Sequence, residues 1–158
     1  AALAGVPYVL TCPSADPECF FAEQLPLLES KGVTDIILDP GFGFGKTIDD
    51  NFRILSNLSS LRYFGRPLLV GVSRKSMVYN TLEIKASEAL NGTAVLHTIA
   101  LLQGADILRV HDVREAVEAI SLVAKLASQS SLSSLSSQSS KTSQSSQSSL
   151  TKKIEKTN

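Results

Sequence analysis

The sequence predicts an α/β fold of parallel βα units, as in the C-terminal half of a (β/α)8 TIM barrel. Short apolar runs alternate with amphipathic segments at roughly the thirty-residue period of a βα unit. Continuously apolar strands are typical of parallel sheets covered on both faces. Polar residues follow these strands at their C-terminal ends, where a (β/α)8 barrel builds its active site. An open doubly wound sheet, which binds ligands at the same ends, is the alternative.

The first unit begins near the N-terminus. Residues 7–10 are apolar and predict a strand, and Asp16 before Pro17 is a favourable start for the following helix. Gly32 is a residue type that commonly ends helices, so the helix should stop there. Pro26 lies inside this segment and predicts a kink or a restart, because proline removes a backbone donor.

The most informative stretch is residues 36–47, which joins an apolar run to a glycine-rich turn. Residues 36–38 predict a buried strand that ends on Asp39, and Pro40 with the following glycines prevents the strand from continuing. Glycines also let a backbone approach a ligand closely, so we expect a binding site here. Pro40 stands where a P-loop requires glycine, and Lys46 stands where the Rossmann fingerprint requires one. An ordinary strand-to-helix turn is the remaining alternative.

The helix after this turn should begin at Thr47, because Asp50 has the spacing of the reciprocal residue in a capping box. We expect it to cover about residues 48–58. Its buried face should hold Ile48, Phe52 and Leu55.

The third strand is predicted at residues 67–72, directly before Ser73, Arg74, Lys75 and Ser76. A long helix should then cover about residues 86–103 and end at Gly104. Its buried stripe is expected to hold Leu90, Ala94, Thr98 and Leu101.

The fourth strand is predicted at residues 106–110 and leads to His111. Asp112, with Glu115 three residues later, fits a capping pattern for the last helix. That helix is expected to carry Ala116, Val117, Ile120, Val123 and Ala124.

Composition favours small-molecule chemistry. The chain has 15 basic and 15 acidic residues, and this zero net charge predicts no nucleic-acid or membrane-surface partner. No apolar run approaches the ~18 residues that a membrane span needs. Cys12 and Cys19 do not form a CxxC pair, and we interpret them as reduced thiols of a cytoplasmic protein rather than a disulfide or a zinc site.

The chain should divide into two parts. Residues 1–127 carry the βα units, with enough apolar residues for one domain with a sizeable core. Residues 128–158 are a low-complexity segment rich in serine and glutamine, and we expect disorder there because little in it repays the entropy of ordering. The chain starts at Ala1 without methionine, in residues that suggest the end of a helix, so a fragment is expected.

Arg109 and His111 are the strongest anion-binding candidates. They are two residues apart, so the alternation of a strand places both on one side, where they suit a phosphate or pyrophosphate. The alternative is that Arg109 pairs with a carboxylate and His111 is a cap. Arg74 and Lys75 would by themselves be read as a solvated charge pair, but their position at a strand end beside two serines favours a binding role. His97 lies among apolar neighbours and is expected to be a packing residue.

Three motifs together resemble the C-terminal half of dihydropteroate synthase. They are Asp39–Lys46, Ser73–Ser76 and Arg109–Val113, and the resemblance covers about residues 1–126. It implies a (β/α)8 fold and the folate-pathway transfer of a pterin from 6-hydroxymethyl-7,8-dihydropterin pyrophosphate to 4-aminobenzoate. It also implies a possible homodimer. Thr11–Cys12 stands where the family usually has a Met-His pair.

The resemblance also implies the roles of individual residues. Asp39 would bind the nitrogen side of the pterin and Lys75 its carbonyl side, while Phe44 would pack near the aminobenzoate and Ser76 would receive its carboxylate. Arg109 and His111 would hold the pyrophosphate. Arg74 completes the set of substrate-binding candidates, and the catalytic candidates are Lys75, Arg109 and His111.

The first half of the family's barrel is missing from this chain. The resemblance places the protein ligand of a Mg2+ cofactor, and the mobile catalytic loops, in that missing half. We therefore expect the isolated chain to be inactive. A noncatalytic remnant that binds a pterin or an anion is the alternative.

Overall fold

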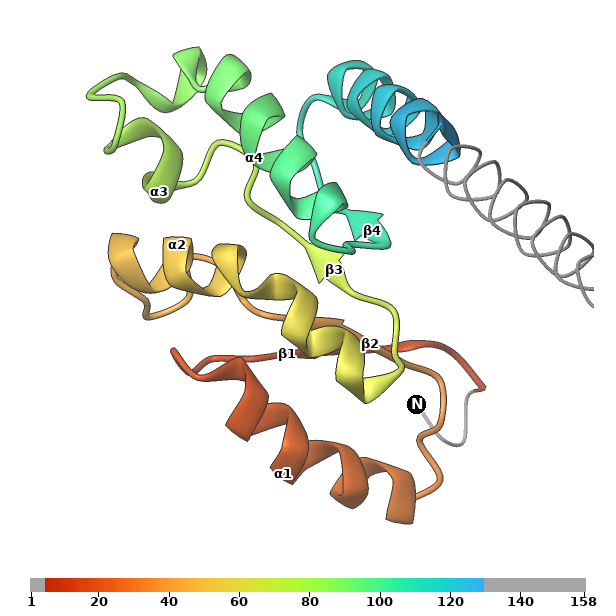
Figure 1. The fold of residues 1–158 in the computed structure, drawn as a ribbon. Helices are drawn as coiled ribbons and strands as arrows, with labels where there is room; N and C mark the ends of the chain where they lie inside the picture. Colours follow the sequence, from red (N-terminus) through yellow and green to blue (C-terminus); the bar gives the residue numbers. More distant parts are fainter. Residues whose placement is uncertain (1–4, 130–158) are drawn as a thin grey trace, which may run out of the picture. The chain divides into compact units, whose positions relative to one another are not determined.

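The structure, a computed structural model, describes residues 5–129 of the 158-residue chain. The chain divides into two compact units, Ala1–Ile120 and Ser121–Asn158. The first unit contains every strand described below (Figure 1). In the second, residues 121–129 are helical. Of the predicted disordered segment only residues 128 and 129 are described, and the rest lies outside the described residues.

The strands are all parallel, as predicted. They are β1 (Tyr8–Thr11), β2 (Ile36–Asp39), β3 (Leu69–Val70) and β4 (Ile107–Leu108). β1 pairs with β2 and β3 pairs with β4, and a parallel bridge between Leu38 and Leu68 links the two pairs. The sheet therefore follows the chain order, and the C-terminal ends of all the strands meet at one edge.

Helical segments connect each strand to the next (Figure 1). They are α1 (Pro17–Ser30), α2 (Ile48–Ser56), η1 (Leu58–Phe64), α3 (Ser76–Tyr79), η2 (Ala86–Glu88) and α4 (Leu90–Leu102). Residues 113–120 are helical after β4. None of the helices within residues 5–129 is long and apolar enough to cross a membrane.

The helix ends follow the predicted local chemistry. The Asp16 side chain accepts the Cys19 N–H at 3.0 Å, and Thr47 and Asp50 form the expected capping box. Gly32 adopts φ +76°, and its N–H bonds to the Glu29 carbonyl at 2.9 Å as the chain leaves α1. These short-range signals therefore fix the helix boundaries.

The predicted restart at Pro26 is wrong, because α1 runs unbroken from Pro17 to Ser30. Pro26 leaves the Ala22 carbonyl without its helical donor. Both residues lie on the exposed side of α1, where water can hydrogen-bond that carbonyl.

The predicted buried faces of two helices also need correction. In α2 the buried residues are Asn51, Ile54 and Leu55, whereas Ile48 and Phe52 are half-buried. In α4 the buried residues are Thr93, Leu96, His97 and Ala100, and the predicted stripe of Leu90, Ala94, Thr98 and Leu101 is half-buried. Apolar residues surround most of α4, so periodicity alone does not select one face, and in α2 a polar residue occupies the buried position.

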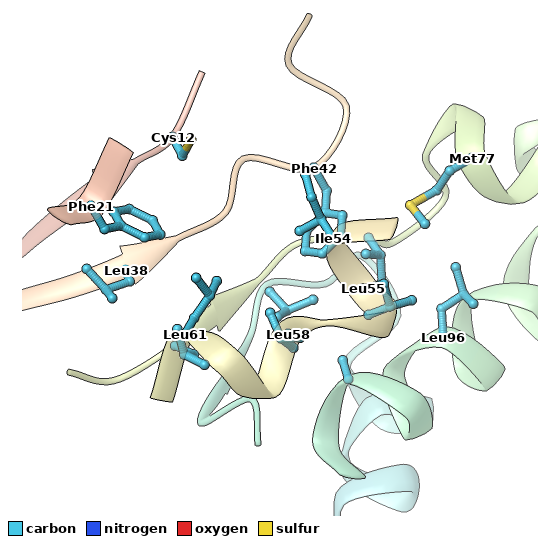
Figure 2. Close-up of a cluster of buried hydrophobic side chains, with 14 of the residues drawn as sticks. Cys12, Phe21, Leu38, Phe42, Ile54, Leu55, Leu58, Leu61, Met77 and Leu96 are labelled. Carbon is cyan, nitrogen blue, oxygen red and sulfur yellow. The ribbon is translucent and has the colours of Figure 1, made fainter. Parts of the chain in front are cut away.

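The core lies between the strands and the helices that follow them. Figure 2 shows Phe21 of α1 beside Leu38 of β2, with Leu58 and Leu61 of η1 nearby. Phe42, from the glycine-rich turn, lies close to Ile54 and is 1% exposed. Because Phe42 is anchored in the core, the turn that carries it is held against the strand ends.

We predict that Gly41→Ala destabilises the chain far more than Gly65→Ala. Both glycines have positive φ, +72° and +62°, which costs alanine about 1–2 kcal/mol. A Cβ at Gly41 would also stand 2.0 Å from the Cys12 carbonyl oxygen, whereas a Cβ at Gly65 meets nothing within 4 Å. This overlap adds roughly 1–3 kcal/mol. Urea unfolding of both variants measures the difference, and equal losses would contradict the close approach of the turn to β1.

Candidate active site

The buried carboxylate of Asp39 is the centre of the site. Asp39 ends β2 and is 1% exposed. Its Oδ1 accepts the Gly41 N–H at 2.8 Å, and its Oδ2 accepts the Thr11 hydroxyl at 3.5 Å. Arg109 completes the set, with its Nη2 at 3.0 Å from Oδ2. Groups from three strand ends therefore converge on one carboxylate.

Lys75 approaches the same place from the end of β3. Its Nζ donates to the Phe42 carbonyl and lies 4.8 Å from the centre of the Phe44 ring. Its stem lies against Gly43, where a Cβ would stand 3.2 Å from the Lys75 Cδ. Burial, and then the nearby Arg109 charge, hold the pKa of the Lys75 ammonium below its ordinary value.

Phe44 is 53% exposed, so its ring is open to a ligand beside the Lys75 ammonium. Ser76 begins the short helix α3 and is half-buried. The structure thus brings Asp39, Phe44, Lys75 and Ser76 to one end of the sheet, although their roles toward a substrate stay predictions.

Arg109 and His111 both follow β4. The Arg109 side chain is 51% exposed yet reaches Asp39, which is the carboxylate pairing left open as an alternative in the sequence. The His111 N–H donates to the hydroxyl of the buried Ser73 at 3.2 Å, and its Nδ1 lies 3.0 Å from the same oxygen. Ser73 therefore fixes where the imidazole points.

Arg74 has a different environment from the other predicted site residues. Its Nε and Nη2 each donate to one Asp112 oxygen at 2.8 Å, and Nη1 donates to the carbonyls of Ala86 and Ser87 at 3.0 and 2.7 Å. Its backbone is left-handed, with φ +51°, and its N–H bonds to the Thr93 hydroxyl at 3.0 Å. Arg74 thus ties the η2 region to the end of β4, and its predicted role in substrate binding stays untested.

The Arg74 contact also changes the predicted role of Asp112. Asp112 does precede a helix, as its capping pattern with Glu115 predicts. Both of its carboxylate oxygens, however, accept from Arg74. Hydrogen bonding to Arg74 is the main reason that the pKa of Asp112 lies below its usual value.

Two residues that hold the glycine-rich turn were not among the predicted site residues. The Lys46 Nζ donates to the carbonyls of Cys12 and Gly41, both at 2.9 Å, and to that of Phe44 at 3.4 Å. The buried Asn51 accepts the Gly43 N–H at 2.8 Å and donates to the Thr47 carbonyl at 2.6 Å. No sequence pattern predicts such bonds between side chains and the main chain.

His97 is buried on α4, as expected of a packing residue. Its Nε2 has no hydrogen-bond partner within the described part of the chain. Burial lowers the pKa of the imidazole, which favours its neutral form.

The charges at the strand ends suit an anion. Lys46 and Lys75 lie close enough to Asp39 for their charges to interact with its carboxylate. Arg109 forms a direct ion pair with the same carboxylate. The positive charge that these side chains place near Asp39 favours a multiply charged anion beside a group that pairs with Asp39.

Comparisons with known proteins agree with this chemistry. The family model described as pterin binding enzyme matches residues 14–111. The dihydropteroate synthase of Escherichia coli (strain K12) is 45% identical over 105 residues, which is 65% of this chain and 37% of that protein. The chain thus spans little more than a third of this relative.

Solved structures show the same similarity. A dihydropteroate synthase of Yersinia pestis with a pterine-sulfa conjugate matches with a TM-score of 0.77 and 39% identity, over 81% of this chain and 54% of that chain. The enzyme of Thermus thermophilus in complex with 6HMPPP matches with a TM-score of 0.73 and 32% identity, over 79% and 55% of the two chains.

We predict that Lys46→Met lowers the unfolding free energy by about 1.5–3 kcal/mol, because methionine keeps the stem but loses the charged donor to buried carbonyls. Urea unfolding at neutral pH measures the loss. Lys31→Met is the matched control, since Lys31 is exposed, and it should stay within about 0.5 kcal/mol of the parent. Equal effects of the two substitutions would mean that Lys46 does not hold the turn.

We also predict that acid removes the contribution of the Arg74–Asp112 pair. Because the folded pKa of Asp112 lies below the ordinary value of 3.8, the pair stabilises the fold above that pH, and its contribution is lost as pH falls through the folded pKa. Parent and Asp112→Asn should therefore differ in stability at neutral pH and converge in acid. Unfolding curves from about pH 7 to pH 2.5 test this, and a constant difference would contradict it.

Proposed function

Because the chain belongs to the pterin-binding enzyme family, we propose that it is the C-terminal part of a dihydropteroate synthase. The proposed reaction joins 6-hydroxymethyl-7,8-dihydropterin pyrophosphate to 4-aminobenzoate and releases pyrophosphate. The observation that carries the proposal is the convergence of Asp39, Lys75 and Arg109 on one point at the strand ends.

Asp39 is the proposed partner of the pterin. A carboxylate accepts two parallel hydrogen bonds from a guanidine-like ring edge, and the bonds are charge-assisted when that edge is cationic. Because Asp39 is buried and already hydrogen-bonded by Gly41, its orientation is set before any ligand arrives. Lys75 lies beside it with an ammonium that can donate to the ring carbonyl.

Phe44 and Ser76 are the proposed contacts of the aminobenzoate. The exposed Phe44 ring offers an apolar surface, and the Ser76 hydroxyl with the start of α3 can donate to a carboxylate. We keep Arg74 as a positioning residue for this region, because its guanidinium ties the η2 segment to Asp112.

The chain's own residues can assist the departure of pyrophosphate. The arylamine lone pair forms the new C–N bond while the C–O bond to pyrophosphate breaks, and the amine then loses a proton to solvent. Negative charge grows on the leaving oxygen, where Arg109, His111 and Lys75 can stabilise it. An arylamine is nucleophilic without deprotonation, so this mechanism requires no strong general base.

The proposal includes a Mg2+ cofactor whose protein ligand belongs to the N-terminal half of the family's barrel. Residues 5–129 contain no group of three His, Cys, Asp or Glu side chains that could hold a metal ion. Asp39, the carboxylate at the centre of the site, is paired with Arg109. The described residues therefore do not fit a Mg2+ site by themselves, and we route no step through the metal.

We further propose that the complete protein is a cytoplasmic homodimer with small-molecule substrates. Free Cys12 and Cys19 support a reducing compartment, and the exposed apolar residues Val95 and Leu102 on α4 offer a surface for a second copy. The second candidate function is noncatalytic binding of a pterin or an anion, which the positive charge of Lys75 and Arg109 beside Asp39 also supports.

The proposed function is tested by completing the barrel. The first four βα units of the E. coli relative, fused before this chain, should restore synthesis of dihydropteroate, whereas residues 1–158 alone should show none. In the completed enzyme, Arg109→Ala should lose roughly ten- to a hundredfold in kcat/KM for the pterin pyrophosphate, because a charge-assisted contact is removed.

Ser76→Ala is the matched variant in this assay. It should weaken the binding of aminobenzoate and leave pyrophosphate binding unchanged, as titration calorimetry can show. A well-folded fusion without activity would favour the noncatalytic alternative. Turnover by residues 1–158 alone, at a rate near that of the relative, would show that the added units are not needed.

A further inference from the structure

The carboxylate proposed to bind the pterin is already occupied by a cation. Arg109 Nη2 lies 3.0 Å from Asp39 Oδ2, which also accepts the Thr11 hydroxyl, and Oδ1 accepts the Gly41 N–H. A guanidine-like ring edge needs both carboxylate oxygens on its side. Arg109 therefore occupies an atom that such a ligand would use.

Arg109 has to cross a neighbouring strand to reach this carboxylate. It follows β4, whereas Asp39 ends β2, and β3 lies between them in the sheet order. The guanidinium passes over Gly71, directly after β3. A Cβ at Gly71 would stand 3.0 Å from Nη2 and 3.1 Å from Nε. Because Gly71 has no side chain, the Arg109 guanidinium has room to pass over β3.

A buried carboxylate without a partner is costly, which explains why the guanidinium is drawn to it. The other two cations nearby are engaged elsewhere: Lys75 donates to the Phe42 carbonyl, and Lys46 to the carbonyls of Cys12 and Gly41. Asp39 itself is 1% exposed, but the Arg109 side chain is 51% exposed. The guanidinium can therefore leave toward solvent without disturbing the core.

We propose that Arg109 pairs with Asp39 before a substrate binds and exchanges this carboxylate for the anion of the incoming substrate. This inference rests on the proposed function. A pterin without an anion must displace the guanidinium and leave it unpaired, whereas a pterin pyrophosphate provides the displaced guanidinium with a new partner. Arg109 thus makes the site select a guanidine-edged heterocycle that carries a polyanion.

The exchange links two ligands thermodynamically. Pyrophosphate draws Arg109 away from Asp39 and should tighten the binding of a plain pterin, and the plain pterin should tighten the binding of pyrophosphate by the same factor. The probes are 6-hydroxymethylpterin, followed by its fluorescence, and inorganic pyrophosphate, both titrated into residues 1–158.

In the parent chain, saturating pyrophosphate should tighten pterin binding about fivefold or more. Arg109→Ala should bind the plain pterin at least as tightly as the parent does, and pyrophosphate should no longer have an effect. Gly71→Ala keeps the charge but crowds the guanidinium, so it should bind the plain pterin more tightly than the parent. Arg66→Ala is the control, since Arg66 pairs with Glu29 at the opposite end of the strands, and it should behave as the parent.

A second measurement needs no ligand. Urea unfolding of the parent, Asp39→Asn, Arg109→Ala and the double variant should give non-additive losses of stability, because the two side chains contact each other directly. Additive losses would overturn the pairing from which the inference starts.

The outcomes separate this inference from the proposed function. If the parent binds the pterin but pyrophosphate does not affect that binding, or if Arg109→Ala weakens plain pterin binding, the exchange is overturned and the proposed function stands. If the parent binds no pterin while the unfolding cycle shows coupling, the pterin site itself is contradicted, and the exchange with it.

Discussion

The burial of the Asp39 carboxylate is the constraint on which the site depends. At 1% exposure this group needs hydrogen-bond donors from the protein, and no single strand can provide them all. β1 contributes the Thr11 hydroxyl, the turn after β2 contributes the Gly41 N–H, and β4 contributes the Arg109 guanidinium. The parallel order of the strands brings these three donors together at one edge of the sheet. The strand arrangement that defines the fold therefore also provides the hydrogen bonds that the buried Asp39 carboxylate needs.

Irregular backbone beside the strands is held by ammonium groups rather than by a ladder of main-chain bonds. Lys46 and Lys75 donate to carbonyls of the β1 end and of the glycine-rich turn. Burial lowers the pKa of both lysines, so part of the stabilisation is offset by the cost of keeping a charge there. That same charge favours an anion at the strand ends. The same two lysines therefore hold the glycine-rich turn and, under the proposed function, provide positive charge for an anion.

The sequence predicted features that depend on near neighbours. The strand that ends on Asp39, the Thr47–Asp50 capping box and the end of α1 at Gly32 all follow from residue types within a few positions. The sequence did not predict features that depend on a contact with a residue far away in the chain. The buried face of α2 includes Asn51 because this amide bonds the Gly43 backbone, and Asp112 turns to Arg74, which is 38 residues away. The sequence left the pairing of Arg109 with a carboxylate open, and only the strand order shows that the carboxylate is Asp39.

Under the proposed function, both kinds of group that a pterin pyrophosphate requires lie within the part of the chain described here. The carboxylate proposed for the heterocycle ends β2, and the cations proposed for the anion follow β3 and β4, with Gly71 leaving the space between them. The chain spans 37% of the length of the E. coli relative, and the contacts that we propose to distinguish an activated pterin from a plain one lie within its described residues. Units that complete the barrel can add ligands and loops. Under the proposed exchange they do not have to supply this discrimination, because Arg109 and the pterin would compete for one oxygen of the Asp39 carboxylate at the end of the sheet.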